Sequence, residues 1–257
     1  MVQIDEHAVV SPKAELGENV RIGPFAVVEE GVQIGENSSV ASGARLARGT
    51  RVGRNVQIFS GAVLGTDPQD LKFEGEETFL EIGDGTVIRE YATLNRGTKE
   101  SWVTRVGKNC LIMAYTHIAH DCHIGDNVIL ANAVNLAGHV TIEDWASLGG
   151  MVPVHQFIRI GAHAFVGGGY RVVKDVPPFV LVMGEPLQFG GINLVGLRRR
   201  GFSPEQLTSI RHAYRIIYQS KLNVSQALAR IREEMEMTTE IRSIVDFIEK
   251  SERGIVR

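Results

Sequence analysis

Cysteines and aromatic residues are scarce in this 257-residue chain, and long apolar segments are absent. The two cysteines, Cys110 and Cys122, are too few for the disulfide framework that supports many small secreted domains. No stretch approaches the roughly 20 consecutive apolar residues that a membrane-spanning helix requires. The acidic amino-terminal segment lacks the apolar core of a secretory signal. We therefore expect a cytoplasmic protein without a transmembrane segment.

A surplus of basic residues is also absent, because the net charge is −3. We therefore expect no nucleic-acid partner. Aromatic residues make up only 7% of the chain, whereas glycine occurs 28 times. This combination is unusual for a compact core and typical of a repetitive fold with many tight corners.

Aliphatic side chains recur every six residues from Ile4 to Val172, and the series is interrupted only by Asp70, Glu76 and Glu100. A small or β-branched residue usually follows four positions later, and both cysteines occupy this second position. A period of six matches neither the helical nor the strand repeat, but it fits a short strand followed by a turn. We therefore predict a parallel β-helix of hexapeptide repeats, with about 18 residues per coil and coils about 4.8 Å apart. The cysteines are then structural.

Two polar segments, at about 66–78 and 96–104, interrupt the repeat. Insertions in a solenoid project as loops and often border a binding site. Both segments are therefore functional candidates, and a neutral insertion is the alternative.

The repeat ends after Val172, and Pro177-Pro178 disfavour further strand pairing. We expect a linker to about residue 200, and then a helix whose capping box begins at Ser203. Further helices are expected at about 225–236 and 239–251. We accordingly assign a β-helix to 1–190 and an α-helical domain, which would cover the strand edges at one end, to 191–257.

Histidines cluster in one part of the repeat, since five of the eight lie between residues 117 and 155. Counting about 18 residues per coil places His120, Gly138-His139 and His155-Gln156 at one corner of three successive coils. The same count places residues 99–103 one coil below. An isolated surface histidine is usually without function, but three stacked corners beside a loop favour a functional site.

Asp121 directly follows His120, and a carboxylate can fix the imidazole tautomer and raise its basicity. An ordinary histidine pKa near 6.5 suits a general base at neutral pH. The N–H of Gly138, one coil above, is a candidate donor to an oxyanion. Because the chain has no Gly-x-Ser-x-Gly motif and its cysteines are internal, direct attack by a substrate hydroxyl is favoured over an acyl-enzyme.

The chain resembles the acyl-[acyl carrier protein]–UDP-N-acetylglucosamine O-acyltransferases, which belong to the hexapeptide-repeat acyltransferases. The resemblance covers nearly the whole chain, including the tail. It rests on Gln69-Asp70-Leu71-Lys72, Leu94-Asn95-Arg96-Gly97-Thr98, His117-Ile118-Ala119-His120-Asp121-Cys122, Gly138-His139-Val140, Val154-His155-Gln156-Phe157, Asp175-Val176-Pro177-Pro178 and Gly196-Leu197-Arg198-Arg199-Arg200-Gly201-Phe202. It implies a mainly β fold, with a left-handed parallel β-helix followed by a small C-terminal α-helical domain. It also implies a homotrimer with sites between adjacent β-helices.

The resemblance further implies transfer of an (R)-3-hydroxyacyl chain from acyl carrier protein to the glucosamine 3-hydroxyl of UDP-N-acetylglucosamine, the first step of lipid A biosynthesis. His120 would be the base, Asp121 would orient it, and Gly138 would bind the oxyanion. We expect no cofactor and no metal ion. The implied substrate-binding residues are Gln69, Asp70, Lys72, His117, His139, His155, Gln156, Asn193, Arg199 and Arg200.

The resemblance also concerns the length of the acyl chain and the carrier protein. Gly168 matches the position that limits the acyl chain, and a glycine there favours a longer one. Tyr170 and Arg171 are bulky, however, so the chain length stays open. The basic run Arg198-Arg199-Arg200 suits an acidic carrier protein or is a solvated charge run.

Three other functions are alternatives. A trimeric β-helix metalloenzyme of the carbonic-anhydrase kind would use the histidines as zinc ligands, but the spacing of His117, His120 and His123 puts them on different sides of a coil. The related N-acyltransferase of the same pathway has an extra amino-terminal uridine-binding domain, for which repeats that begin at Ile4 leave no room. A non-catalytic scaffold or sugar-nucleotide sensor would not need His120-Asp121 beside two loops.

Overall fold

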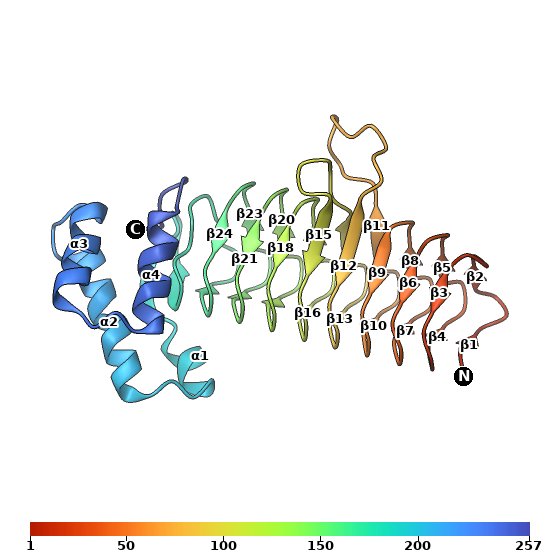
Figure 1. Ribbon diagram of the computed structural model, residues 1–257, viewed down its shortest axis with the longest axis horizontal. Coiled ribbons are helices and arrows are strands. Elements are labelled where there is room, and N and C mark those ends of the chain that lie inside the picture. The colour runs from red at the N-terminus through yellow and green to blue at the C-terminus, as the bar shows by residue number, and fades with distance from the viewer.

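Stacked coils of short strands form a three-sided prism, with a group of helices at its carboxyl-terminal end (Figure 1). The computed structural model describes residues 1–257. The prism is a left-handed β-helix, and each of its three faces is one sheet. The expected fold class is therefore confirmed.

The three faces are named sheets A, B and C. Sheet A contains β1 (Gln3–Ile4), β4 (Arg21–Ile22), β7 (Ser39–Val40), β10 (Gln57–Ile58), β13 (Val87–Ile88), β16 (Leu111–Ile112), β19 (Ile129–Leu130), β22 (Ser147–Leu148), β25 (Phe165–Val166), β26 (Val180–Met183) and β27 (Gln188–Ile192). Sheet B contains β2 (Val9–Val10), β5 (Val27–Val28), β8 (Arg45–Leu46), β11 (Val63–Thr66), β14 (Thr93–Asn95), β17 (His117–Ile118), β20 (Asn135–Leu136) and β23 (Pro153–Val154). Sheet C contains β3 (Glu15–Leu16), β6 (Gln33–Ile34), β9 (Thr50–Val52), β12 (Phe79–Ile82), β15 (Val103–Val106), β18 (His123–Ile124), β21 (Thr141–Ile142) and β24 (Arg159–Ile160).

The six-residue aliphatic series lies on the inside of the prism. Ile118 pairs in register with Leu136, and both side chains are buried. Ile88 pairs with Ile58 below and Ile112 above, all members of the same series, so the two loops leave its phase unchanged. The second repeated position fills the inner corners, and burial there raises the pKa of Cys110 to about 11 and that of Cys122 to about 12. Both thiols therefore stay protonated, which agrees with a structural role for the two cysteines.

Most corners are two-residue turns whose second residue has positive φ. Asparagine tolerates this left-handed conformation better than most residues. At the corner between sheets C and A it is used repeatedly, by Asn19, Asn37, Asn55, Asn109 and Asn127. We call this edge the asparagine corner.

The prediction of a linker from Val172 to about residue 200 is wrong, because the β-helix continues beyond Val172. Val172 pairs with Val154, Val176 pairs with Ile160, and β26 adds to β25 in parallel. Pro177 and Pro178 lie at a turn, where the missing N–H groups interrupt no ladder. The antiparallel strand β27 then closes the edge of sheet A.

Four helices follow the last strand: α1 (Leu194–Arg199), α2 (Pro204–Gln219), α3 (Val224–Glu234) and α4 (Thr239–Glu249). Ser203 forms the expected capping box with Gln206 at the start of α2. Helices α2, α3 and α4 pack together and bury one continuous apolar cluster with the end of the prism. None of these helices is long and apolar enough to cross a membrane.

Candidate active site

Two loops project from the same corner of the prism, between sheets B and C (Figure 1). Residues 67–78 connect β11 to β12, and residues 96–102 connect β14 to β15. The turns 120–121, 138–139 and 156–157 lie at the same corner on the following coils, because His139 N–H donates to the His120 carbonyl and Phe157 N–H donates to that of Gly138. We call this edge the loop corner. The coil count placed these turns correctly.

Asp121 is the buried centre of the site, with a side chain that is 0% exposed. Its Oδ1 accepts hydrogen bonds from Thr98 N–H at 2.9 Å and from the Ser101 hydroxyl. Its Oδ2 accepts from the Thr98 hydroxyl at 2.7 Å and from His120 Nδ1 at 2.8 Å. Burial alone would raise the pKa of Asp121, but the hydrogen bonds from His120, Ser101 and Thr98 outweigh it and hold this pKa well below its usual range.

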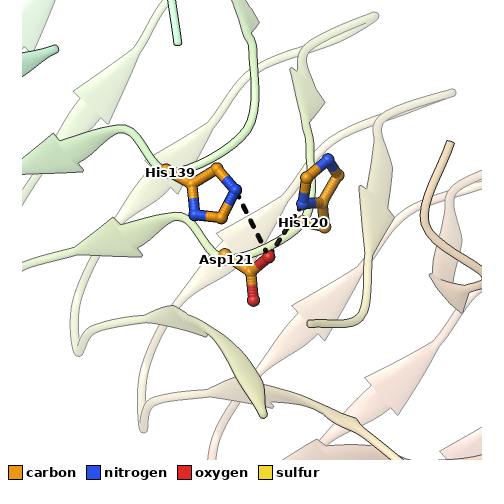
Figure 2. A group of neighbouring side chains, drawn as sticks. All are labelled: His120, Asp121 and His139. Atoms are coloured by element: carbon orange, nitrogen blue, oxygen red, sulfur yellow. Dashed lines mark hydrogen bonds and ion pairs between the residues drawn. The ribbon is translucent and has the colours of Figure 1, made fainter. Parts of the chain in front are cut away.

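His120 presents its second ring nitrogen away from Asp121 (Figure 2). Asp121 accepts a hydrogen bond from His120 Nδ1, so the neutral ring carries its proton on Nδ1. The lone pair on Nε2 is then free. The hydrogen bond to Asp121 raises the pKa of His120, burial opposes that rise, and the charges of Asp121, Asp70 and Glu100 add to it. Nε2 has no partner in the chain, and the side chain is 12% exposed. A ring nitrogen in this arrangement can accept a proton from a nearby hydroxyl group.

Gly138 lies directly over the His120 ring. A Cβ atom at this position would stand 2.6 Å from His120 Cε1 and 2.9 Å from Nε2, closer than such atoms approach in proteins. Only glycine therefore leaves room for the ring in this orientation. The Gly138 N–H donates no hydrogen bond within the chain, so a donor without a partner stands beside the face of the base.

His139 crosses the ring of His120 edge-on at 5.2 Å (Figure 2). Its Nε2 lies 3.5 Å from Glu100 and 3.7 Å from Asp121 Oδ2. On its other side the ring stacks on Phe157 at 4.5 Å. His139 is thus fixed by one coil above it and one loop below it.

His117 is on β17, and its Nδ1 lies 2.8 Å from the Thr93 hydroxyl. Burial lowers the pKa of His117, a positive charge on His120 lowers it further, and the hydrogen bond with Thr93 opposes them. The net shift favours the neutral form of His117. Two coils above His120, at the same corner, lie His155 and Gln156. His155 Nδ1 is 3.2 Å from the Gln156 carbonyl oxygen.

The loop of residues 67–78 brings Gln69, Asp70 and Lys72 to the loop corner. Asp70 accepts from Lys72 N–H at 3.0 Å, which makes a tight turn, and its charge acts on His120. The side chains of Gln69 and Lys72 are exposed and unpaired. Arg96 joins the two loops through a 2.9 Å ion pair with Asp67.

The chain as a whole is similar to known proteins. A model described as UDP N-acetylglucosamine O-acyltransferase, domain 2, matches residues 175–256, and one described as bacterial transferase hexapeptide matches 13–48 and 104–138. An acyl-[acyl-carrier-protein]–UDP-N-acetylglucosamine O-acyltransferase of Alkalilimnicola ehrlichii is 57% identical over 100% of both chains. One from Thiobacillus denitrificans is 51% identical, again over 100% of both. The chain belongs to this O-acyltransferase family.

Solved structures of family members have the same fold. A UDP-N-acetylglucosamine acyltransferase from Bacteroides fragilis superposes with a TM-score of 0.96 at 46% identity, over 98% of this chain and 99% of that one. The corresponding enzyme from Francisella novicida gives a TM-score of 0.96 at 41% identity, over 99% of this chain and 94% of that one. The likeness therefore covers the prism and the helices together.

Other residues to which the family resemblance gave roles lie far around the prism. Asn193 caps α1, since its Oδ1 accepts from Gly196 N–H at 3.2 Å, and its Nδ2 donates to the His163 carbonyl at 2.9 Å. Arg200 Nη1 lies 3.3 Å from His163 Nδ1, at the asparagine corner, and Arg199 is exposed beside it. Burial lowers the pKa of His163 to about 4, and Arg200 adds to this effect.

Gly168 and Tyr170 are at the third corner, between sheets A and B. Gly169 N–H donates to the Gly150 carbonyl at 2.8 Å, which places the turn 168–169 above the turn 150–151. Tyr170 lies over Gly167, where an added Cβ would approach its ring to 3.0 Å. The proposed family residues are therefore divided among all three corners of a single chain.

His120, Asp121 and His139 bring ligand atoms within 4.8 Å of one another and are the candidate metal ligands of the chain. Zinc binds such atoms at about 2.0–2.2 Å and needs their lone pairs. Here the Asp121 oxygens already accept four hydrogen bonds, and His120 donates from Nδ1. His117 and His123, the other two members of the alternative zinc set, lie on different faces of the prism. The geometry favours a hydrogen-bonded base over a metal site.

Sequence reasoning missed several residues that complete the site. Thr98 and Ser101 hold Asp121, Glu100 faces His139, and Phe157 stacks on it. The coil count had placed residues 99–103 one coil below the histidines, which was the available signal for the loop residues. It could not say which of their side chains turn inward.

Proposed function

We propose that this chain transfers an (R)-3-hydroxyacyl group from acyl carrier protein to the 3-hydroxyl of the glucosamine ring of UDP-N-acetylglucosamine, as the first step of lipid A biosynthesis in the cytoplasm. The observation that carries the proposal is the free Nε2 of His120. A buried carboxylate binds the other ring nitrogen, Nδ1, and the unpaired Gly138 N–H lies beside the ring. The names of the full-length relatives support the substrate classes.

In the proposed reaction His120 Nε2 removes the proton of the sugar hydroxyl as its oxygen attacks the thioester carbonyl carbon. The Gly138 N–H donates to the oxyanion of the tetrahedral intermediate. Collapse of the intermediate breaks the carbon–sulfur bond and forms the ester. The imidazolium then returns its proton to the departing thiolate of the carrier, and His120 is neutral again. Asp121 stays ionised throughout and stabilises the imidazolium.

A homotrimer explains how distant residues could meet one substrate. The loop corner carries the base, whereas Asn193 and Arg200 flank the asparagine corner and Gly168 lies at the third. One prism cannot turn all its corners toward one ligand, but neighbouring copies around a threefold axis can bring different corners together. On this proposal Asp70, Lys72, His117, His139, His155 and Gln156 surround the sugar and acyl groups, with Gln69 beside them. Asn193, Arg199 and Arg200 of a neighbouring copy meet the nucleotide.

We further propose a division of tasks along the chain. Residues 1–190 carry the chemistry, and residues 191–257 close the end of the prism and offer exposed basic side chains to the acidic carrier protein. Gly168 and Tyr170 would limit the length of the acyl chain, with no cofactor or metal ion taking part.

The deciding experiment measures acyl transfer from a panel of 3-hydroxyacyl carrier proteins to UDP-N-acetylglucosamine by the wild type and by His120→Ala. We expect transfer by the wild type and a loss of roughly 10² or more in the variant, because the base is removed. Thr208→Val, on the outer surface of α2, is the control and should retain full activity. No transfer with any chain length would refute the proposed reaction.

A further inference from the structure

The Asp121 carboxylate is saturated with donors. A carboxylate offers about four lone-pair sites, and here Thr98 N–H, the Thr98 and Ser101 hydroxyls and His120 Nδ1 occupy one each. Three of the four donors come from the loop of residues 96–102 rather than from the repeating coils. The loop therefore controls most of what this carboxylate contacts.

The two hydroxyl protons are directed toward Asp121. Thr98 Oγ1 accepts from Glu100 N–H at 3.2 Å, so its own proton is free to go to Asp121 Oδ2. The Ser101 hydroxyl has two acceptors in reach, Asp121 Oδ1 and the Val103 carbonyl at 3.0 Å. The ionised carboxylate is the stronger acceptor, because hydrogen bonds to charged groups are about twice as strong as neutral ones.

We propose that Thr98 and Ser101 are positioning residues that limit the basicity of His120 by hydrogen bonding to its carboxylate partner. This inference rests on the proposed function, in which His120 must be neutral to accept a proton. Each hydroxyl draws negative charge away from Asp121, which weakens its hold on the Nδ1 proton and on the imidazolium form. The loop thus keeps the base unprotonated near neutral pH while the carboxylate still fixes its orientation.

Other charged and titratable groups also face the base. Asp70 lies on the first loop, Glu100 on the second, His117 on β17 and His139 on the coil above. These groups are the same in the wild type and in variants that lack the Thr98 or Ser101 hydroxyl. A difference in the His120 pKa between those proteins therefore measures the effect of the missing hydroxyl. The loop also has backbone anchors of its own, since Trp102 N–H donates to the Thr98 carbonyl at 2.7 Å and Gly97 N–H to that of Phe79 at 3.1 Å.

The test is a titration of the His120 imidazole in Thr98→Val, Ser101→Ala and the wild type. Carbon-13 labelling at histidine Cε1 gives eight signals, and the one that disappears in His120→Ala belongs to this residue. We expect the pKa of His120 to rise by about half a unit or more in each variant. Thr98→Ser, which keeps a hydroxyl, should restore the wild-type value. Thr86→Val, which removes a buried hydroxyl that binds the Gly107 carbonyl at the asparagine corner, should leave it unchanged.

The pH profile of kcat/KM supplies a second readout. The acidic limb should move upward with the pKa, so that both variants lose more activity at pH 6 than at pH 9. An unchanged His120 pKa, or an equal loss of activity at every pH, would show that the hydroxyls only support the fold and would overturn the inference. Failure of the proposed acyl transfer is a separate outcome, because the titration needs no turnover.

Discussion

Carboxylates at the loop corner and at the asparagine corner begin from the same structural device and end with different properties. At both corners an aspartate accepts one backbone N–H: Asp121 from Thr98 of the loop at 2.9 Å, and Asp126 from Lys108 of the coil below at 2.7 Å. Asp126 stays accessible to water and accepts no side-chain hydrogen bond. Asp121 has a fully buried side chain and gains three further donors.

The difference between the corners comes from the insertion and not from the repeat. On every edge of the prism the repeating coils supply stacked turns. The backbone N–H groups of these turns either have no partner or donate to a neighbouring coil. Only the loop of residues 96–102 adds hydroxyl groups and covers the carboxylate. A structural carboxylate becomes part of a candidate catalytic pair where a loop excludes water from it.

The largest expected effect follows from placing a methyl group at the loop corner with Gly138→Ala. Ala114 and Ala162 occupy the same position of the turn at the other two corners, so a Cβ is compatible with the turn itself. At residue 138 it would stand 2.6 Å from His120 Cε1 and force the ring away from Asp121. A displacement of about 1 Å in a catalytic group can cost roughly 10² in rate. We expect a loss of this size in kcat with a nearly unchanged melting temperature, and unaltered kcat would contradict the proposed role.

A smaller effect is expected from removing the charge at each corner, with Asp121→Asn and the matched control Asp126→Asn. In Asp121→Asn the new NH2 group would face hydrogen-bond donors, so buried polar groups would lose their partners. This loss should lower the free energy of unfolding by about 1–3 kcal/mol. It should also lower kcat about tenfold or more, because the His120 tautomer is no longer fixed. Asp126→Asn keeps an oxygen acceptor in water and should change stability by less than about 0.5 kcal/mol. Thermal denaturation and kcat of the two variants decide this, and equal effects would remove the distinction between the corners.

The regular part of the fold was predictable because its signal is repeated. Each inward aliphatic position has the same environment, so Ile88 or Leu130 could be placed inside from spacing alone. The same counting brought His120, Gly138 and Gln156 to one corner. It worked because the chain from Val106 to Val172 contains no insertion.

Features without a repeat could not be placed in this way. The turns that direct Thr98 and Ser101 toward Asp121 depend on the path of a single loop, which no periodicity describes. The continuation of the prism after Val172 was missed because two prolines normally end a strand, whereas here they occupy a turn between paired segments. In the proposed homotrimer, the positions of Asn193 and Arg200 relative to His120 depend on neighbouring copies, which one sequence does not display.

The smallest expected effect tests how far the loop acts by charge alone, with Glu100→Gln. Glu100 is 58% exposed and lies 3.5 Å from His139 Nε2, and its charge raises the pKa of His120. Without that charge the imidazolium is less stabilised, so the acidic limb of the kcat/KM profile should move to lower pH by a few tenths of a unit. This shift is opposite in sign to the one expected for Ser101→Ala, and it should shrink in high salt. Glu36→Gln, at the asparagine corner, is the control, and a shift to higher pH in Glu100→Gln would show that Glu100 acts by holding the loop in place instead.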